Sequence, residues 1–288
     1  MFFALKTRLV TLSQVFNYTK NPLLCLSTYI SRKKAKISFK WGFIEELTWL
    51  QIRAIVKLAD SGWYALYCSR EGHILFTDGV LKFIAPSINK IGVLGEGHKL
   101  YRRFNYNGTI VLDIGAFTGD SLILFFKWGA KKVIAYEPIP ENVESIKQNV
   151  KTNKLERKVI INSYAVSDKN GYLTFTYDDL GIDFGLKEGK HEITLPCVSI
   201  KEVLKASEKI DIAKVDCEGC EKHLLKIDEL IIPNWVIEVH DISTLRALIK
   251  HFKEKKYHTQ VEQVELLKDV FMLYAKRCFK PPRSELKR

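Results

Sequence analysis

The chain has 288 residues, a formal net charge of +12, 47% hydrophobic residues and 27% charged residues. This composition is typical of a globular protein and excludes a largely disordered one. No uncharged apolar run approaches the ~18 residues of a membrane span, so we expect neither a spanning helix nor a cleavable signal peptide.

The positive charge is concentrated at the two ends of the chain. Residues 1–40 contain eight Lys or Arg and no acidic residue, and residues 276–288 contain six Lys or Arg and one Glu. A nucleic-acid enzyme usually carries its basic surface on the folded face that meets phosphates, so this pattern argues against a nucleic-acid partner. Basic ends suit an acidic partner or an anionic membrane surface. We expect a cytoplasmic protein, with a membrane-peripheral location as the alternative.

Residues 1–40 are predicted to form a basic, amphipathic helical segment. One helical face carries an apolar stripe, consisting of Phe2, Leu5, Leu9, Leu12 and Phe16. Two interpretations remain open: an interfacial helix on a membrane, or a helix packed on the body or on a partner. At the other end, residues 277–288 are predicted to be a basic disordered tail.

The cysteines contain one close pair, Cys217 and Cys220, in a Cys-x-x-Cys spacing. The other four are scattered: Cys25, Cys68, Cys197 and Cys278. A structural zinc site needs four ligands, and no second pair is present. We therefore expect reduced, packing cysteines and no metal site, with a redox role for the pair as the alternative.

Residues 41–104 are predicted to form a small α+β extension. It begins with a helix over Leu47–Ala59. Three short strands separated by Glu-Gly and Asp-Gly turns predict a meander: Tyr64–Cys68, Ile74–Thr77 and Leu81–Ile84.

From residue 105 to 276 the chain alternates β-branched runs with amphipathic helices, as a parallel α/β sheet does. The predicted parallel strands are Thr109–Asp113, Lys132–Glu137, Lys158–Asn162, Ile210–Asp216 and Trp235–His240. A β-rich insertion, Tyr172–Tyr177 and Glu192–Val198, brackets the loop Asp178–Lys190. The domain ends in an antiparallel hairpin of Tyr257–Glu265 and Val270–Lys276, which plain dinucleotide-binding folds lack.

The end of the first predicted strand carries a glycine-rich turn, Asp113-Ile-Gly115-Ala-Phe-Thr-Gly119-Asp120. Ligands of open α/β sheets bind at the carboxyl ends of the strands, and glycine lets the backbone turn tightly there. The negative Asp113 favours a ligand with an ammonium or sulfonium group over one with phosphates. Glu137 ends the second strand, where an acid is placed to accept both ribose hydroxyls of an adenosine ligand.

A second group of polar residues follows the fourth and fifth strands. Asp216 and Glu218 come after the fourth strand, and Glu238, His240 and Asp241 come at the end of the fifth. Because the carboxyl ends of parallel strands meet at one edge of a sheet, we expect these groups to form a site.

Four stretches together resemble the FkbM-like family of S-adenosylmethionine-dependent methyltransferases. Two departures occur: Phe117 stands where the family usually has Asn, and Cys217 and Cys220 replace apolar residues. The matching stretches are Val111-Leu-Asp-Ile-Gly-Ala-Phe-Thr-Gly-Asp120, Ala135-Tyr-Glu-Pro-Ile-Pro-Glu-Asn142, Ser163-Tyr-Ala-Val-Ser-Asp168 and Lys214-Val-Asp-Cys-Glu-Gly-Cys-Glu221.

The resemblance implies a Rossmann-like class I methyltransferase fold, with a mostly parallel seven-stranded sheet and a C-terminal antiparallel hairpin. It implies S-adenosylmethionine as cofactor and O-methylation of a hydroxyl on a sugar or other small molecule. Asp216, Glu218 and His240 are the implied catalytic residues. The implied cofactor-binding residues are Asp113, Gly115, Ala116, Phe117, Gly119, Glu137, Pro138, Tyr164 and Ala165.

Methyl transfer to an alcohol requires alignment of the attacking oxygen and a general base within about 3 Å. His240 is the natural base at neutral pH, because Asp216 or Glu218 would need a raised pKa. A divalent metal on the oxygen ligands is an alternative. The other functions left open are a nicotinamide-dependent oxidoreductase, an RNA or protein methyltransferase, and a non-catalytic, membrane-associated module. The expected partners are a small-molecule or glycan hydroxyl acceptor and, through the basic N-terminus, a membrane surface.

Overall fold

A computed structural model of the chain describes residues 12–70, 72–87, 90–92, 94, 98–177, 191–205, 209–264 and 269–278. Most of the predicted N-terminal stripe, the insertion loop 178–190 and the tail from residue 279 lie outside this range. Two compact units are interleaved along the chain, whereas the segments predicted from the sequence are continuous. Unit 1 comprises Met1–His98, Phe117–Lys127 and Pro140–Arg157, and unit 2 comprises Lys99–Ala116, Trp128–Ile139 and Lys158–Arg288.

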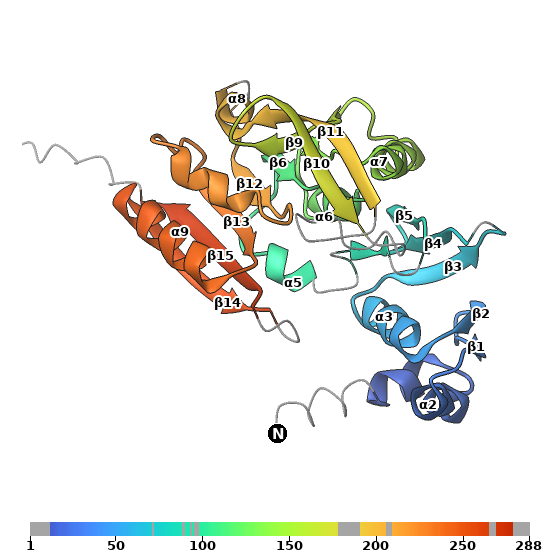
Figure 1. The fold of residues 1–288 in the computed structure, drawn as a ribbon. Coiled ribbons are helices and arrows are strands. Elements are labelled where there is room, and N and C mark those ends of the chain that lie inside the picture. The colour runs from blue at the N-terminus through green and yellow to red at the C-terminus, as the bar shows by residue number, and fades with distance from the viewer. Residues whose placement is uncertain are drawn as a thin grey trace, which may run out of the picture. The chain divides into compact units, whose positions relative to one another are not determined.

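Unit 2 is built on a seven-stranded sheet with the order β14-β15-β13-β12-β6-β7-β8 (Figure 1). Five strands are parallel, and β15 runs antiparallel to both β13 and β14. This order confirms the predicted class I methyltransferase sheet with its C-terminal hairpin. The strands are β6 (Ile110–Ile114), β7 (Lys132–Tyr136), β8 (Val159–Asn162), β12 (Ile212–Val215), β13 (Asn234–Val239), β14 (Tyr257–Gln263) and β15 (Phe271–Arg277).

The sheet forms because its central strands are apolar on both faces, apart from the buried pair of Asp113 and Lys214. All four residues of β12 and the last four of β6 are buried. Helix α9 (Ile242–Glu254) begins at Asp241, whose carboxylate accepts a hydrogen bond from the Thr244 amide at 2.8 Å. Its inward side chains Leu245, Leu248 and Phe252 join the core around Trp235. The shorter helices of this part of the chain are α5 (His98–Tyr101), α8 (Ile200–Lys205) and the 3-10 helix η2 (Glu221–Lys226).

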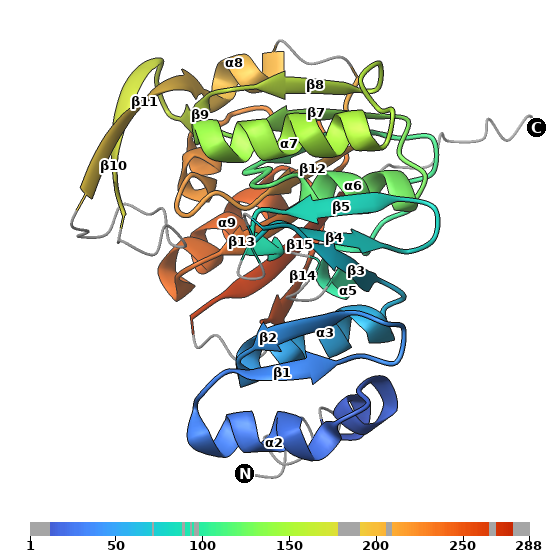
Figure 2. The ribbon, with the colours of Figure 1, turned by 90° about the vertical axis from the view of Figure 1, so that its right-hand side faces the viewer.

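The predicted β-rich insertion is a separate three-stranded sheet of unit 2, with the order β10-β11-β9. Its strands are β9 (Ala165–Ser167), β10 (Gly171–Tyr177) and β11 (His191–Ser199). Strands β10 and β11 pair antiparallel over their full length, and Figure 2 shows them extending away from the seven-stranded sheet.

Unit 1 contains the predicted helix and meander. Helix α3 begins after Thr48, which forms a capping box with Gln51. Strands β3 and β4 have the predicted bounds, and β5 begins one residue later. The elements are α2 (Pro22–Ser31), β1 (Ala35–Ser38), β2 (Ile44–Leu47), α3 (Trp49–Asp60), β3 (Tyr64–Cys68), β4 (Ile74–Thr77), β5 (Lys82–Ala85), α6 (Asp120–Lys127) and α7 (Pro140–Thr152).

The segment predicted as helical up to residue 40 ends instead in a strand. Strand β1 pairs antiparallel with β2, and this hairpin crosses the boundary predicted at residue 40. The reason is alternation: Ile37 and Phe39 are buried while the residues between and beside them are more exposed, which is the period of a strand.

Two asparagines, Asn149 of α7 and Asn153 just after its end, close the edge of the meander. The Asn149 side-chain amide donates to the Ile84 carbonyl at 3.1 Å and accepts from the Ile84 amide at 2.7 Å. One helical turn later, Asn153 bonds the Lys82 amide and carbonyl in the same way. These side chains satisfy backbone groups of β5 that a further strand would otherwise pair.

Within the described ranges, no helix has both the length and the apolar character that crossing a membrane requires.

Candidate functional site at the carboxyl ends of the central strands

The glycine turn after β6 is fixed by its two neighbouring strands. Gly115 has φ +79°, and a Cβ at this position would collide with the Asp216 carbonyl oxygen at the end of β12. On the other side, the Gly115 and Ala116 amides donate to the Tyr136 carbonyl of β7 at 2.9 and 3.1 Å. The turn therefore lies between the ends of β7 and β12, and only glycine fits its first position.

A buried ion pair supports this turn. Lys214 of β12 is 1% exposed, and its Nζ lies 3.1 Å from Asp113 Oδ1 and 2.5 Å from the Gly115 carbonyl oxygen. The same ammonium lies 3.5 Å from Asp216 Oδ2. Asp113 is fully buried, so it acts on the turn through Lys214.

The other residues of the predicted cofactor site in unit 2 follow β7 and β8. Glu137 is 5% exposed, and its Oε1 accepts a hydrogen bond from the Ile139 amide at 3.1 Å. Its own amide donates to the Asn162 carbonyl at 3.1 Å. Pro138 is half-buried, Tyr164 is exposed, and Ala165 is buried at the start of β9.

Phe117 and Gly119 belong to unit 1. Gly119 has φ +86°, and a Cβ there would lie 3.4 Å from Ile146 of α7. Phe117 has φ +47°, a left-handed conformation that Asn tolerates far better than a bulky residue. The residue that the family usually has at this position therefore matches the backbone better than the one present.

Two carboxylates and a tyrosine meet at the ends of β12 and β13. The Tyr101 hydroxyl lies 2.7 Å from Glu238 Oε2 and 3.0 Å from Asp216 Oδ2. One hydroxyl proton satisfies one of these contacts, and the second becomes a hydrogen bond when a carboxyl keeps its proton. Burial and the neighbouring charge of Asp216 raise the pKa of the Glu238 carboxyl.

His240 lies among three glutamates. Its Nε2 is 3.4 Å from both Glu218 Oε2 and Glu238 Oε1, and its Nδ1 is 3.6 Å from Glu221 Oε1. Burial opposes the charged imidazolium, but hydrogen bonds to these carboxylates outweigh it and raise the pKa of His240 to about 12. A histidine that keeps its proton at neutral pH cannot take one from an alcohol. This geometry favours Glu238 over the predicted His240 as base.

The loop that carries Glu218 is closed by a disulfide between Cys217 and Cys220, whose Cα atoms are 5.5 Å apart. Glu218 and Gly219 have φ values of +53° and +114°, which turn the chain so that the two sulfurs meet. The expectation of reduced cysteines is wrong for this pair in the structure. Of the others, Cys25 and Cys197 are buried, as predicted for packing residues.

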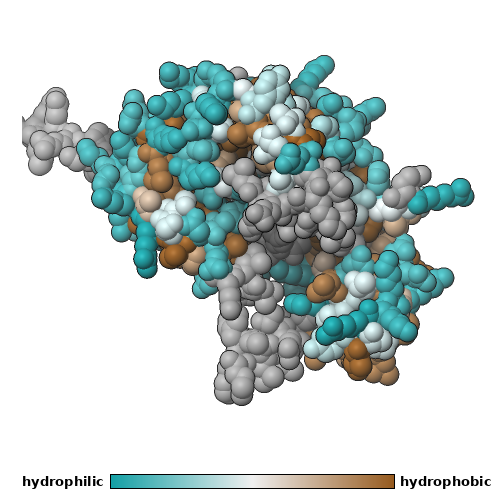
Figure 3. Space-filling view, viewed as in Figure 1, coloured by the Kyte–Doolittle hydropathy of each residue, from teal (hydrophilic) through white to brown (hydrophobic). Residues whose placement is uncertain are grey.

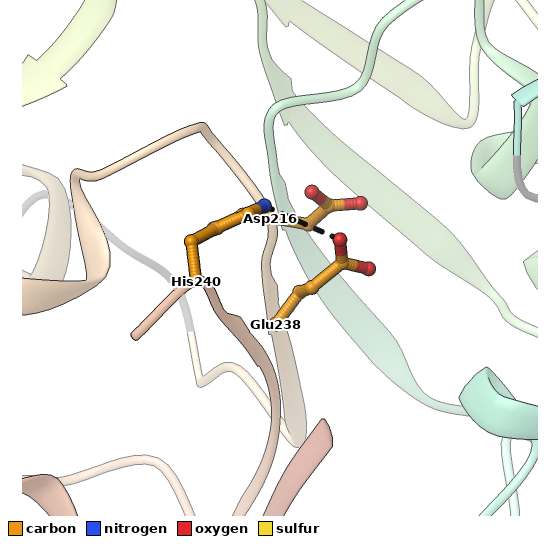
Figure 4. A group of neighbouring side chains, drawn as sticks. All are labelled: Asp216, Glu238 and His240. Atoms are coloured by element: carbon orange, nitrogen blue, oxygen red, sulfur yellow. Dashed lines mark ion pairs between the residues drawn. The ribbon is translucent and has the colours of Figure 1, made fainter. Parts of the chain in front are cut away.

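Asp216, Glu238 and His240 are the one group of metal-ligand type gathered within the described residues, with ligand atoms within 4.8 Å of one another (Figure 4). Tyr101, Lys214 and the imidazolium already engage these carboxylates. An ion there would have to displace them.

The fold brings together Asp216, Glu218, Glu238 and His240, as predicted from the sequence. Asp241 instead caps α9. Tyr101, Lys214 and Glu221 also belong to the site, and the sequence did not predict this. Lys214 left a signal, because a lysine interrupts an otherwise apolar strand. Tyr101 left none, because it lies in a segment without a pattern.

Replacing Lys214 by Met should lower the free energy of unfolding by about 3–5 kcal/mol, since Asp113 would stay buried without its cation. Urea denaturation measures this change, and adding Asp113→Asn should recover part of the loss. The control is Lys147→Met in the exposed pair with Glu144 (3.4 Å), which should cost less than about 1 kcal/mol. Equal losses at the two lysines would contradict the role of the buried pair.

His240 makes the stability of the chain depend on pH. The folded state holds the imidazolium proton up to a pKa of about 12, whereas an unfolded histidine loses it near pH ~6.5. This contribution is complete below pH ~6.5 and declines as the pH rises. Relative to His240→Gln, the wild-type free energy of unfolding should therefore fall by up to about 1.4 kcal/mol per pH unit between pH 7 and 9.

Urea denaturation at each pH tests this difference. His258→Gln, at an exposed position of β14, controls for the loss of a histidine as such. Parallel profiles for the wild type and His240→Gln would show that the three glutamates do not hold the proton.

Several solved structures are similar to the chain. The precorrin-6y C5,15-methyltransferase from Geobacter metallireducens GS-15 has 13% identity and a TM-score of 0.40, with 64% of this chain and 87% of that chain covered. The M. jannaschii TYW2 structure in complex with AdoMet has 17% identity and a TM-score of 0.44, covering 74% and 90%. The M. jannaschii tRNA m1G37 methyltransferase has 18% identity and a TM-score of 0.45, covering 75% and 57%. Similarity at this level supports no conclusion about reaction or substrate.

Among curated proteins, no relative matches the chain. The family comparison is informative: the model of the methyltransferase FkbM domain matches residues 113–264, more than half of the chain. The match begins at Asp113, just before the glycine turn, and ends after β14. It therefore includes the glycine turn and the acidic residues that follow β12 and end β13. The chain belongs to the FkbM methyltransferase domain family.

Proposed function

We propose that the chain is an S-adenosylmethionine-dependent methyltransferase that methylates a hydroxyl group of a sugar or other small molecule. The observation that carries this proposal is the close approach of Gly115 to the Asp216 carbonyl. It brings the glycine turn next to the acidic group at the end of β12. Strand order reverses between β6 and β12, and ligands of open α/β sheets bind at such switch points.

The residues around the turn fit this cofactor. Glu137 offers a nearly buried carboxylate to the ribose hydroxyls, and the exposed ring of Tyr164 offers a stacking surface to adenine. Lys214 holds the glycine turn in place through the Gly115 carbonyl. When bound, the cofactor supplies an electrophilic methyl group on a sulfonium.

We assign Glu238 as the general base, which accepts the proton of the acceptor hydroxyl. Burial and the charge of Asp216 raise the pKa of the Glu238 carboxyl, which brings its proton affinity closer to that needed at neutral pH. The Tyr101 hydroxyl lies within hydrogen-bond distance of both carboxylates, which supports the proposal that a hydroxyl group binds beside them. His240 stays protonated, and with Glu218 and Glu221 it holds Glu238 in position.

A small hydroxylated acceptor suits this group better than a nucleic acid. Carboxylates accept hydrogen bonds from sugar hydroxyls, whereas they repel phosphates. Between the two basic ends the chain carries no excess of positive charge.

Glu137→Ala should weaken binding of S-adenosylmethionine by about tenfold or more, because the ribose hydroxyls lose their acceptor. Isothermal titration calorimetry measures the affinity. Glu144→Ala, at an exposed glutamate, is the control and should bind as the wild type does. An unchanged affinity of Glu137→Ala for S-adenosylmethionine would show that Glu137 does not bind the ribose. Tighter binding of NAD than of S-adenosylmethionine would contradict the proposed cofactor.

Glu238→Gln should lower the turnover of methyl transfer by about 10²-fold or more, because the amide cannot accept the proton. Release of S-adenosylhomocysteine over a panel of hydroxylated sugars and of transfer RNA measures it, and the affinity for S-adenosylmethionine should stay unchanged. Glu229→Gln is the exposed control. Methylation of the RNA alone would contradict the proposed small-molecule acceptor. Full activity of Glu238→Gln would contradict the assignment of Glu238 as the base.

A further inference from the structure

Helix α2 carries apolar residues on two opposite faces. Cys25 and Thr28 are buried on the inner face, which lies against β1 and α3. At 100° per residue, Leu23, Leu26 and Ile30 point away from that face, at i, i+3 and i+7. A helix that serves only to cover the body of unit 1 needs no apolar residues there.

Two of these outward residues are strongly exposed, and Leu26 is half-buried. The exposed fraction is 74% for Leu23 and 82% for Ile30, and Leu24 is also exposed. Figure 3 shows hydrophobic surface at the lower right, over the N-terminal elements. Several large apolar side chains gathered on one helix mark an interaction surface, in contrast to scattered single ones.

Exposed cations surround this helix. Lys20 precedes it, and the turn after it carries three successive cations, followed by two more on and beyond β1: Arg32, Lys33, Lys34, Lys36 and Lys40. The first acidic residue of the chain is Glu45. The apolar stripe of α2 is thus followed directly by Arg32, Lys33 and Lys34, whereas Lys36 lies opposite Glu46 in the β1–β2 pair.

We propose that the outer face of α2, formed by Leu23, Leu26 and Ile30 with the basic residues at its ends, docks on a membrane surface that contains anionic lipids. The stripe enters the boundary between headgroups and acyl chains, while the cations contact the lipid headgroups. A second copy of this face would bring the cations Arg32, Lys33 and Lys34 of the two copies together, and like charges repel. A nucleic acid would meet the cations but leave the leucines and the isoleucine without an apolar partner.

This surface is distinct from the stripe predicted over Phe2–Phe16, most of which lies outside the described residues. It is also independent of the proposed reaction, because it concerns where the chain binds and not what it methylates.

Sedimentation of the full chain with vesicles tests the proposal. We expect binding to phosphatidylcholine vesicles that contain about 30% phosphatidylserine, much weaker binding to phosphatidylcholine alone, and loss of binding as salt is raised. Leu23→Ser with Ile30→Ser should weaken the partition coefficient by about tenfold or more. Val80→Ser with Tyr172→Ser removes two equally exposed apolar side chains elsewhere and should leave it unchanged.

The basic residues have their own matched pair of variants. Arg32→Gln, Lys33→Gln and Lys34→Gln together should weaken binding to the anionic vesicles, whereas Lys131→Gln, Lys151→Gln and Lys158→Gln at exposed positions should have a much smaller effect. Circular dichroism and thermal melting establish that each variant is folded.

Equal binding to neutral and anionic vesicles, or no loss on removing Leu23 and Ile30, would overturn the proposal. A dimer that the α2 variant dissociates, without any vesicle binding, would assign the face to a second copy instead. Light scattering after gel filtration detects that outcome.

Discussion

The site depends on one buried cation. Lys214 connects Asp113 of β6, the Gly115 carbonyl and Asp216 after β12, so a single ammonium fixes both the glycine turn and the start of the acidic group. A buried lysine is stable only when its charge is paired and its protons are hydrogen-bonded. The same requirement that keeps Lys214 buried therefore sets the spacing between the two halves of the site.

The two cations of the site offset only part of its negative charge. Four carboxylates, on Asp216, Glu218, Glu221 and Glu238, face the cations of Lys214 and His240. Such clusters move pKa values in opposite directions, because each group is stabilised in the state that lowers the net charge. This explains why the imidazolium is stabilised while the Glu238 carboxyl holds its proton more strongly.

The two proposed functions, methyl transfer and membrane docking, rest on separate parts of the sequence. The FkbM domain match covers the residues of the candidate site except Tyr101, whereas the apolar and basic face of α2 lies well before it. A methyltransferase whose acceptor is a hydroxylated headgroup or a membrane-bound glycan would gain from such a surface, because docking raises the local concentration of acceptor. The two proposals are compatible and rest on different residues.

The sequence by itself determined the sheet and most of the polar residues at the carboxyl ends of its strands. Short, mostly apolar runs such as Ile110–Ile114, alternating with helices, favour buried parallel strands. The acids follow those strands directly, so their convergence at one edge is a consequence of topology. It did not determine protonation, the disulfide, or the partners Tyr101 and Lys214. The pKa of His240 depends on three glutamates from two different segments, and Tyr101 reaches Asp216 across 115 residues of chain. Only the tertiary structure decides these, because burial and distance between remote side chains set electrostatic energies that no local pattern contains.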